Sequence, residues 1–541
     1  MKAAKIIMKC LKEEDVNLVF GYPGGAVLPL FEAIRESNIE HVLVRNEQSL
    51  VHYASGYYRT TGKVGVCIAT SGPGATNTIT GIATAYLDSI PVIVITGQVN
   101  TDLLGTDAFQ EADIKGATEP FTKHSYLIKD PNEIPRVFKE AFYLANSGRK
   151  GPVLIDIPRN VQEENIKYQK CEEINIIGYQ PTLLGHRGQV KRAINKIKDS
   201  QRPVIYAGGG VILAEAEKQL LEFAEKNKIP VINSLMGLGS FPQDNPLYAG
   251  IVGSHGYQYS NRIISRADLL IVIGARMSDR ATGRIHQLNS NLQYIHIDID
   301  PAEIGKNIEA MVPIVGDAKL ILQNLTTKEI SVDTDNWLEE IESIRQALPI
   351  NMDMQPGCNF INPKEIISSI SDITGDSACV VADVGLNQIW AALYYKLTAK
   401  RSYFTSGGLG TMGYSLPAAS GVKIGSPQRQ VICIMGDGSF QMTLGELAVI
   451  REQNIGIKII LFNNQRLGMV KGLQDNFYGK NHNCGVHLEC EIEFTKLAEA
   501  YSIPAYKVET IERFREVFSQ VMENNEPCLI QCLIDPEYTA F

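Results

Sequence analysis

The residues best suited to chemistry form two short motifs in the last quarter of the chain. Gly436-Asp437-Gly438 is followed, after 24 residues, by Asn463-Asn464. Glycines let a backbone approach a phosphate closely, and carboxylate and amide oxygens are hard ligands suited to a magnesium ion that also binds phosphate oxygens. The two motifs together therefore indicate a site that clamps a diphosphate.

Both motifs follow apolar runs that read as buried strands, at residues 431–435 and 457–462. The carboxyl ends of neighbouring parallel strands lie at one edge of a sheet, which is where α/β proteins bind ligands. An Asp-Gly pair alone is a common turn. The Asn-Asn pair at a second strand end is what favours the diphosphate site over the simple turn.

A second carboxylate, Glu47, directly follows a predicted strand at residues 42–44. The spacing of Gly-Asp-Gly and Asn-Asn resembles the signature of thiamine-diphosphate enzymes. Such enzymes need a carboxylate that hydrogen-bonds the aminopyrimidine ring of the cofactor, and Glu47 is the candidate. On its own, a glutamate after a strand is usually a solvated turn residue, and only the surrounding pattern favours the catalytic interpretation.

The elements that position these residues recur in three groups. Short β-branched runs alternate with amphipathic stretches, which predicts βαβ units around parallel sheets. A chain of 541 residues exceeds what one hydrophobic core organises, and polar stretches at 162–178 and 328–359 read as linkers. We predict an α/β fold of three doubly wound parallel-sheet domains at residues 1–165, 186–330 and 360–541. The expected strands are 16–20, 42–44, 64–69, 91–96 and 152–157 in the first domain, 203–207, 230–234, 269–273 and 294–299 in the second, and 380–384, 431–435, 457–462 and 528–534 in the third.

The first and third domains echo each other. Gly72-Pro73-Gly74, a helix and the apolar run 91–95 parallel Gly436-Asp437-Gly438, a helix and the run 457–461. We therefore expect one topology in both outer domains, although two unrelated α/β domains could produce so coarse an echo.

The composition narrows the class of protein. Charged residues interrupt the N-terminal stretch where a signal peptide would be apolar, and no run is long enough to span a membrane. A net charge of -9 without a basic stripe argues against nucleic acid. Ten cysteines without a CxxC pair indicate reduced thiols and a cytoplasmic location.

Over nearly its whole length the sequence resembles the catalytic subunits of acetolactate synthases, also called acetohydroxyacid synthases. This resemblance implies an enzyme that decarboxylates pyruvate and condenses the product with a second 2-oxo acid, using thiamine diphosphate, Mg²⁺ and FAD. It also implies a homodimer or a dimer of dimers, with a possible small regulatory subunit. The motifs that carry it include Phe20-Gly21-Tyr22-Pro23-Gly24-Gly25-Ala26, Thr70-Ser71-Gly72-Pro73-Gly74-Ala75-Thr76-Asn77, Gly105-Thr106-Asp107-Ala108-Phe109-Gln110-Glu111, Gly407-Gly408-Leu409-Gly410-Thr411-Met412-Gly413 and Leu467-Gly468-Met469-Val470.

The resemblance implies roles for single residues as well. Glu47 and Gly25 of one chain would face a cofactor whose diphosphate lies on Asp437 and Asn464 of the other chain, and Met412 would wedge between the two rings of the cofactor. The expected catalytic residues are Glu47, Gly25, Gln110 and Lys123; the substrate contacts are Phe109, Arg280 and Leu473; and the magnesium ligands are Asp437, Asn464 and Arg466. The further thiamine-diphosphate contacts are Pro23, Gly74, Asn77, Gly385, Asn387, Gly410, Met412, Gly436, Gly438, Ser439 and Met469.

The central domain resembles a flavin-binding domain. Gly208-Gly209-Gly210 after the strand 203–207 would let the backbone approach a dinucleotide phosphate, and Asp298 could bind a ribose hydroxyl. In this family the flavin takes no net part in the reaction. The expected FAD contacts are Arg149, Gly208, Gly209, Gly210, Leu235, His255, Gly256, Arg276, Asp298, Ile299 and Asp317.

The chain departs from the family pattern near the expected site. Leu473 stands where the family usually has a tryptophan that narrows the acceptor site, Asn46 replaces the usual histidine, and Leu386-Asn387 replaces the usual Gln-His. A hydrophobic pocket separates substrates that differ by one methylene by only about 1–3 kcal/mol. Loss of the tryptophan could remove most of the preference for 2-oxobutanoate over pyruvate. We therefore predict that pyruvate is the main acceptor.

Several alternatives stay open. The chain could be another thiamine-diphosphate carboligase or an oxidase, a flavin-free catabolic acetolactate synthase, or a silent scaffold, although the presence of Glu47, Asp437 and Asn464 argues against the scaffold. A further hypothesis concerns a segment where the family has a variable loop. It contains four soft ligands at a spacing that could hold zinc: His482, Cys484, His487 and Cys490.

Overall fold

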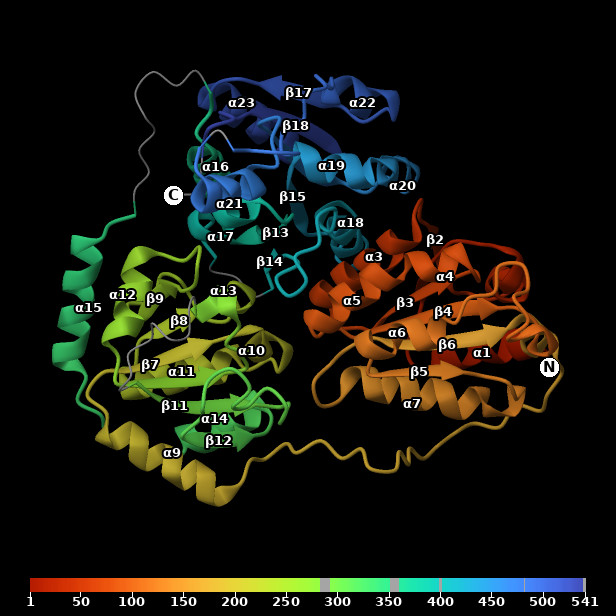
Figure 1. Ribbon diagram of the computed structural model, residues 1–541, viewed down its shortest axis with the longest axis horizontal. Helices are drawn as coiled ribbons and strands as arrows, with labels where there is room; N and C mark the ends of the chain where they lie inside the picture. Colours follow the sequence, from red (N-terminus) through yellow and green to blue (C-terminus); the bar gives the residue numbers. More distant parts are fainter. Residues whose placement is uncertain (283–291, 351–359, 398–400, 481, 539–541) are drawn as a thin grey trace. The chain divides into compact units, whose positions relative to one another are not determined.

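The computed structural model describes residues 1–282, 292–350, 360–397, 401–480 and 482–538 (Figure 1). The chain forms two compact units: described residues within 1–179, 378–388 and 404–538 make the first, and described residues within 180–377 and 389–403 make the second. Three six-stranded parallel sheets are present, one in each of the ranges 1–165, 186–330 and 360–541. The α/β fold with three doubly wound sheets is therefore confirmed.

The first sheet has the strand order β2-β1-β3-β4-β6-β5. The buried faces of α1, α2 and α7 share one core with its central strands, and Figure 1 shows α3 and α5 on the other side of this sheet. The strands are β1 (Leu18–Gly21), β2 (Glu40–Leu43), β3 (Gly65–Ala69), β4 (Val92–Gln98), β5 (His124–Leu127) and β6 (Val153–Pro158). The helices are α1 (Ala3–Glu13), α2 (Leu28–Arg35), α3 (Glu47–Thr61), α4 (Pro73–Asn77), α5 (Ile79–Leu87), α6 (Ile114–Thr118), α7 (Ile134–Asn146) and α8 (Arg159–Glu163).

The third sheet has the order β14-β13-β15-β16-β18-β17. Counted from its own first strand, this is 2-1-3-4-6-5, the same order as in the first sheet, so the expected shared topology is confirmed. The strands are β13 (Ala378–Ala382), β14 (Tyr403–Phe404), β15 (Gln430–Gly436), β16 (Ile457–Asn463), β17 (Ala505–Val508) and β18 (Cys528–Leu533). The helices are α17 (Leu386–Tyr394), α18 (Ser415–Gly425), α19 (Asp437–Thr443), α20 (Leu447–Glu452), α21 (Gly468–Tyr478), α22 (Phe494–Ala500) and α23 (Ile511–Met522).

The second sheet has a different order, β12-β11-β10-β7-β8-β9. Counted from its own first strand and read from the opposite edge, this is 3-2-1-4-5-6, the order of dinucleotide-binding Rossmann folds. The strands are β7 (Pro203–Ala207), β8 (Val231–Asn233), β9 (Tyr248–Ile251), β10 (Leu269–Ile273), β11 (Gln293–Asp298) and β12 (Val312–Val315). The helices of this unit are α9 (Arg187–Asp199), α10 (Gly209–Leu213), α11 (Glu217–Asn227), α12 (Gln258–Arg266), α13 (Asp279–Thr282), α14 (Ala318–Thr326), α15 (Asp335–Ala347) and α16 (Pro363–Thr374).

The sequence did not indicate five strands, namely β5, β9, β12, β14 and β17, and each of them is an edge strand. In β5, β12 and β17 buried residues are mixed with more exposed ones, and β14 has only two residues. An edge strand needs no continuous apolar run because one side of it lacks a neighbour.

The second predicted linker was an incomplete interpretation, because residues 328–359 contain α15. The Trp337 side chain of this helix is 2% exposed, and its Nε1 donates a hydrogen bond to the Pro203 carbonyl oxygen at 3.1 Å. The acidic residues on the exposed face of α15 made this segment read as a linker, although the apolar side of the helix packs on the second sheet.

In the described residues no helix is both long and apolar enough to cross a membrane. The cysteines of the same residues are all free thiols, and six of them are buried. Reduced thiols were expected from the sequence.

Helices α3 and α18 cross in the first unit at two glycines. A Cβ atom on Gly56 would lie 2.0 Å from the carbonyl oxygen of Ala418, and a Cβ on Gly421 would lie 2.0 Å from that of Tyr53. The two backbones are therefore in direct contact, and no larger residue fits. This contact fixes α3, the helix that begins at Glu47, against α18.

Gly56→Ala should lower the free energy of unfolding by about 3 kcal/mol, because one added methyl group must push the two helices apart. Urea unfolding followed by circular dichroism measures this. Gly472→Ala is the matched control: Gly472 lies inside α21, and an added Cβ would meet no atom within 4 Å apart from its chain neighbours and the backbone of its own helix. The control should be unchanged or stabilised by up to about 1 kcal/mol. Equal effects of the two substitutions would contradict the role given to the crossing.

Candidate functional site

Glu47 is the first residue of α3, and its carboxylate is held by the neighbouring turn. Its Oε2 accepts a hydrogen bond from Asn77 Nδ2 at 2.9 Å, and its Oε1 is 3.4 Å from the position of a Cβ on Gly74. Asn77 and Gly74 belong to α4, which follows β3. Asn46, at the position where the family pattern has a histidine, caps α3 by accepting the N–H of Gln48 at 2.9 Å. The structure thus brings together three of the predicted cofactor residues.

The turn after β1 lies against the same segment. A Cβ on Gly24 would be 2.5 Å from Thr70 Oγ1, and the N–H of Ala26 donates to this hydroxyl at 3.3 Å. Pro23 and Gly25 flank Gly24 and are exposed, and no atom lies within 4 Å of a Cβ built on Gly25. An open space therefore borders the exposed backbone of Gly25.

Gln110 joins this edge of the sheet through a strained loop. A Cβ on Gly72 would lie 2.9 Å from the Cβ of Gln110, and Gln110 itself has a φ of 60°, in the left-handed region. The Glu111 carboxylate accepts the N–H of Ala108 at 3.1 Å and holds the loop closed. Phe109, by contrast, is 88% exposed. An apolar ring of this size is free to contact a substrate or another chain.

Lys123 lies elsewhere in the first unit. It precedes β5, and its N–H donates to the carbonyl oxygen of Pro152 at the amino end of β6, whereas Glu47 and its partners follow carboxyl ends of strands. Its ammonium group donates to the Ser147 carbonyl oxygen at 2.6 Å and to the Tyr179 hydroxyl at 2.8 Å. Within one chain, Lys123 does not join the Glu47 cluster.

The Gly-Asp-Gly and Asn-Asn motifs end neighbouring strands, as the sequence indicates. Gly436 at the end of β15 pairs with Phe462 of β16. Asp437 is 2% exposed, and its Oδ1 accepts the N–H of Gly438 at 3.0 Å. Burial raises the pKa of Asp437 to about 6, against the lowering effect of hydrogen bonds from backbone N–H groups. The Asn464 side-chain oxygen accepts the N–H of Arg466 at 3.1 Å.

This donor set fits a divalent cation next to an anion. Asp437 is buried, and a buried carboxylate is costly unless a cation lies next to it. The oxygen of Asn464 retains acceptor capacity beyond the one N–H that it receives. Arg466, whose charge lowers the pKa of Asp437, has a buried Nε without a hydrogen-bond partner among the described residues. Magnesium could bind the two oxygens, and a phosphate oxygen could bind the guanidinium.

The end of β13 completes this edge with a buried aspartate that the motifs did not single out. Asp383 is fully buried, and its carboxylate accepts the N–H groups of Gly413 at 2.9 Å and Ser415 at 2.8 Å. Asn387 Nδ2 donates to the Asp383 carbonyl oxygen at 2.7 Å. The strand order reverses between β13 and β15, which is where such sheets bind ligands. An aspartate that ends the strand before Gly385 was the signal available in the sequence.

Met412 and α21 lie beside the Gly-Asp-Gly turn. A Cβ on Gly438 would be 3.6 Å from the Met412 methyl carbon, and a Cβ on Gly468, where α21 begins, would be 3.1 Å from Asn464 Nδ2. Ser439 closes the turn by donating its hydroxyl to the Gly436 carbonyl oxygen at 3.0 Å. The remaining predicted residues near this edge are Gly385 and Gly410, which have φ of 146° and 76°, and Met469 and Leu473, which are half-buried on α21.

The predicted flavin residues, except Arg149, belong to the second unit and follow carboxyl ends of its strands. The Gly210 N–H donates to the Gly274 carbonyl oxygen at 2.9 Å, and a Cβ on Gly208 would lie 2.2 Å from the same oxygen, so these glycines also serve the crossing of two loops. Asp298 ends β11 and accepts the N–H of Asp300 at 2.9 Å. Asp317 caps α14 by accepting the N–H of Leu320 at 3.0 Å.

The other predicted residues of this unit lie in segments that follow β7, β8, β9, β10 and β11. Gly209 begins α10, and a Cβ there would lie 3.2 Å from the Met236 carbonyl oxygen, next to Leu235. Burial and the charge of Arg280 lower the pKa of His255. The members of this group are Gly209, Leu235, His255, Gly256, Arg276, Arg280 and Ile299.

Two further expectations concern residues outside these clusters. Arg149 lies in the first unit, where its Nε donates to the Ser89 hydroxyl at 3.1 Å. The zinc hypothesis receives no support, since the described residues, which include His482, Cys484, His487 and Cys490, contain no group of three or more His, Cys, Asp or Glu side chains able to hold a metal.

The buried carboxylate of Asp383 predicts a pH effect on stability. Burial raises its pKa to about 6 from the ordinary value of 3.8, so the stabilisation due to its proton is present below about pH 4 and is lost as the pH rises through 6. Asp383→Asn removes this titration. At low pH the variant should be less stable than the wild type, and this difference in the free energy of unfolding should shrink by up to about 3 kcal/mol as the pH rises from about 4 to above 6. Urea unfolding at several pH values measures it. A constant deficit would contradict the assignment.

Comparison with known proteins identifies the class to which this fold and site belong. Models of the thiamine pyrophosphate enzymes match the chain three times: the N-terminal TPP binding domain at residues 1–117, the central domain at 190–325 and the C-terminal TPP binding domain at 383–532. The chain is therefore a thiamine pyrophosphate enzyme by fold and domain order.

Curated relatives narrow the class. The chain is 45% identical to the probable acetolactate synthase large subunit of Methanocaldococcus jannaschii, over 99% of this chain and 92% of that protein. It is 44% identical to the acetolactate synthase large subunit of Corynebacterium glutamicum, over 99% and 87%. It is 40% identical to the acetolactate synthase isozyme 3 large subunit of Escherichia coli, over 99% and 95%. The chain belongs to the family of acetolactate synthase large subunits.

Proposed function

We propose that this protein decarboxylates pyruvate and joins the two-carbon product to a second 2-oxo acid, giving 2-acetolactate when the acceptor is pyruvate. The observation that carries the proposal is the pair of clusters, Glu47 with Asn77 and Asp437 with Asn464, in a chain of this family. Branched-chain amino-acid biosynthesis in the cytoplasm is the setting that we infer.

The first cluster would activate the cofactor. Thiamine diphosphate supplies a nucleophilic carbon and an electron sink for the decarboxylation when it is bound. Glu47 would share a proton with a ring nitrogen of the aminopyrimidine, and the Asn77 amide, 2.9 Å from Oε2, fixes the direction in which the carboxylate points. The Gly25 backbone and the Gln110 amide would donate hydrogen bonds to an oxygen of the 2-oxo acid as negative charge develops there.

The second cluster would hold the diphosphate. Asp437 and Asn464 supply oxygen ligands for Mg²⁺, with Arg466 next to them, and the glycines at 436 and 438 leave the backbone accessible to phosphate oxygens. Met412, whose methyl carbon lies near the Gly438 backbone, would support the ring system of the cofactor. Burial of Asp437 strengthens its attraction for the cation, because few waters screen the charge.

Glu47→Gln should reduce acetolactate formation by more than about a hundredfold, because the amide cannot exchange a proton with the cofactor. The fold should be retained, since the Asn77 amide can still donate to the Gln oxygen. Acetolactate production from pyruvate with thiamine diphosphate and Mg²⁺ is the measurement. Glu32→Gln is the control, because the Glu32 side chain is 57% exposed and pairs only with Arg35 among the described residues. Unchanged turnover in the Glu47 variant would refute the assignment.

The same variant tests the proposed assembly, a homodimer or a dimer of dimers in which each site uses two chains. Glu47→Gln and Asp437→Ala chains are each expected to be inactive. In a mixed dimer, one site receives an intact Glu47 from one chain and an intact Asp437 from the other, so activity returns. Mixing that restores no activity would place both clusters of a site in one chain. Because the relatives are named large subunits, a small regulatory subunit is a further proposed partner.

FAD is the cofactor that we propose for the central sheet. Its strand order is that of dinucleotide-binding folds, and the Gly208-Gly209-Gly210 turn and Asp298 follow carboxyl ends of its strands. The purified protein should be yellow and should release FAD on denaturation, as chromatography of the supernatant can measure. A colourless protein with full acetolactate synthase activity would instead indicate the flavin-free catabolic type.

Leu473 on α21 sets the proposed acceptor preference. Because a leucine fills less of the acceptor site than the tryptophan usual in the family, 2-oxobutanoate and pyruvate should be used with similar efficiency at equal concentration, and pyruvate should dominate where it is more abundant. Leu473→Trp should raise the preference for 2-oxobutanoate about tenfold or more. Product ratios from mixtures of the two acids measure this, and strong preference in the wild type would refute it.

A further inference from the structure

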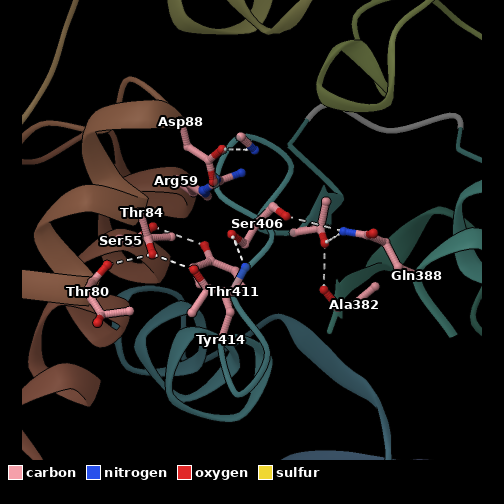
Figure 2. A network of polar contacts seen from close by, with 12 residues as sticks. Ser55, Arg59, Thr80, Thr84, Asp88, Ala382, Gln388, Ser406, Thr411 and Tyr414 are labelled. Atoms are coloured by element: carbon pink, nitrogen blue, oxygen red, sulfur yellow. Dashed lines mark hydrogen bonds and ion pairs between the residues drawn. The ribbon is translucent and has the colours of Figure 1, made fainter. Parts of the chain in front are cut away.

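The segment that carries Gly410 and Met412, residues 404–414, is held by helices of the N-terminal domain. We call this segment the Met412 loop. Figure 2 shows side chains of α3 and α5 pointing at it from one side, while β13 and its following residues lie on the other. The Met412 loop, α3, α5 and β13 all belong to the first unit.

A buried ion pair contacts the loop at its middle. Arg59, in the last turn of α3, pairs with Asp88 at 2.8 Å, and their side chains are 9% and 0% exposed. Asp88 Oδ1 also accepts the N–H of Gly408 at 2.7 Å. A Cβ on Gly408 would lie 2.7 Å from the Leu87 carbonyl oxygen, so the loop backbone rests directly on the end of α5. Asp88, paired with Arg59 and largely shielded from water, thus fixes one peptide group of the loop.

The same guanidinium contacts both ends of the loop. The Arg59 guanidinium carbon lies 5.8 Å from the ring centre of Phe404 and 5.7 Å from that of Tyr414. Cations at such distances are attracted to the face of an aromatic ring. Tyr414 also shares a hydrogen bond with the Ser55 hydroxyl of α3 at 3.0 Å. One helix of the N-terminal domain therefore secures the first and the last residue of the loop.

A hydroxyl pair secures the residue next to Met412. Thr84 Oγ1 of α5 and Thr411 Oγ1 are 2.7 Å apart, and both residues are buried. The N–H of Thr411 donates to the Ser406 hydroxyl at 3.1 Å, so the two arms of the loop are also joined to each other (Figure 2). Thr84 thus holds the residue that precedes Met412.

The other side of the loop is tied to β13. Gln388 Nε2 donates to Thr405 Oγ1 at 2.6 Å, and this hydroxyl donates to the Ala382 carbonyl oxygen at 2.7 Å. The loop contains Gly410 and Gly413 with φ of 76° and 84°, a conformation that local backbone preference does not enforce. Its path therefore depends on contacts from both sides.

We propose that Thr84, Asp88 and Arg59 are positioning residues that hold the Met412 loop in the conformation that binds thiamine diphosphate. This inference rests on the proposed function. According to this proposal the N-terminal domain has a second task besides supplying Glu47. Helix α3 begins at Glu47, and Arg59 in its last turn contacts the Met412 loop. None of the three side chains contacts the reacting atoms.

Two matched substitutions test the inference in the full-length protein. Thr84→Val removes the hydroxyl pair with Thr411 and the bond that Thr84 Oγ1 donates to the Thr80 carbonyl oxygen within α5 at 2.8 Å, and it keeps the shape of the side chain. Thr60→Val removes an equivalent pair between Thr60 on α3 and Ser426 after α18, where the two hydroxyl oxygens are 2.9 Å apart. Both pairs join the N-terminal domain to the C-terminal domain, but only the first touches the loop.

Three readouts separate positioning from general packing. Thr84→Val should speed amide hydrogen exchange in peptides covering residues 404–414 of the cofactor-free protein, and should weaken the binding of thiamine diphosphate with Mg²⁺ about tenfold. The KM for pyruvate, measured at saturating cofactor, should stay within about twofold. Thr60→Val should match the wild type in all three. Asp88→Asn should show the larger effect of the same kind, but it leaves the buried Arg59 unpaired, so the threonine pair is the primary test.

The outcomes are distinct. Faster exchange with unchanged cofactor affinity would overturn the inference, as would equal weakening by Thr84→Val and Thr60→Val. If the wild-type protein binds no thiamine diphosphate, the proposed function fails and the inference falls with it. If the wild type binds the cofactor and forms acetolactate while Thr84→Val behaves as the wild type, only the inference fails.

Discussion

Direct backbone contact between α3 and α18 is the constraint on which the first unit depends. At Gly56 and Gly421 the two helices approach until only hydrogen atoms separate their main chains. The rotation and height of α3 are then set by α18, and the end of α3 that carries Glu47 inherits this position. The buried Arg59–Asp88 pair at its other end adds a second fixed point. A helix fixed twice is a rigid support for the carboxylate that we propose to meet one nitrogen of the cofactor.

Strand order explains why the chemistry gathers where it does. In both outer sheets the strand order reverses between the first and third strands, and ligands of such sheets bind where the residues that follow these strands meet. Gly24 and Gly25 follow β1, and Gly72 to Asn77 follow β3. In the third sheet, Asp383 follows β13 and Asp437 follows β15. Parallel strands therefore bring residues that are far apart in sequence to one edge without any dedicated contact between them.

Much of this was readable from the sequence, and the failures have physical causes. The central strands were found because they are buried on both faces: β7 and β10 have the predicted bounds. Edge strands such as β5 and β17 were missed because exposure interrupts their apolar pattern. Asp383 was missed because its role depends on the N–H groups of Gly413 and Ser415, about thirty residues away, which no local motif reveals. The role of Lys123 stays a prediction from the resemblance: within one chain its N–H bonds to the residue before β6, whereas Glu47 follows the carboxyl end of β2.

The glycine crossing has a further consequence, because it is reciprocal. Gly56 lies three residues after Tyr53 and meets Ala418, while Gly421 lies three residues after Ala418 and meets Tyr53. The two helices also occupy equivalent places, each following the second strand of its own sheet in the shared order. Such self-complementary contact is the mark of a twofold axis between identical subunits. The first unit therefore has an internal pseudo-twofold symmetry, with α3 and α18 related to each other across it. In the proposed function the two halves of this symmetric unit have different tasks, since one supplies the carboxylate of Glu47 and the other the diphosphate site.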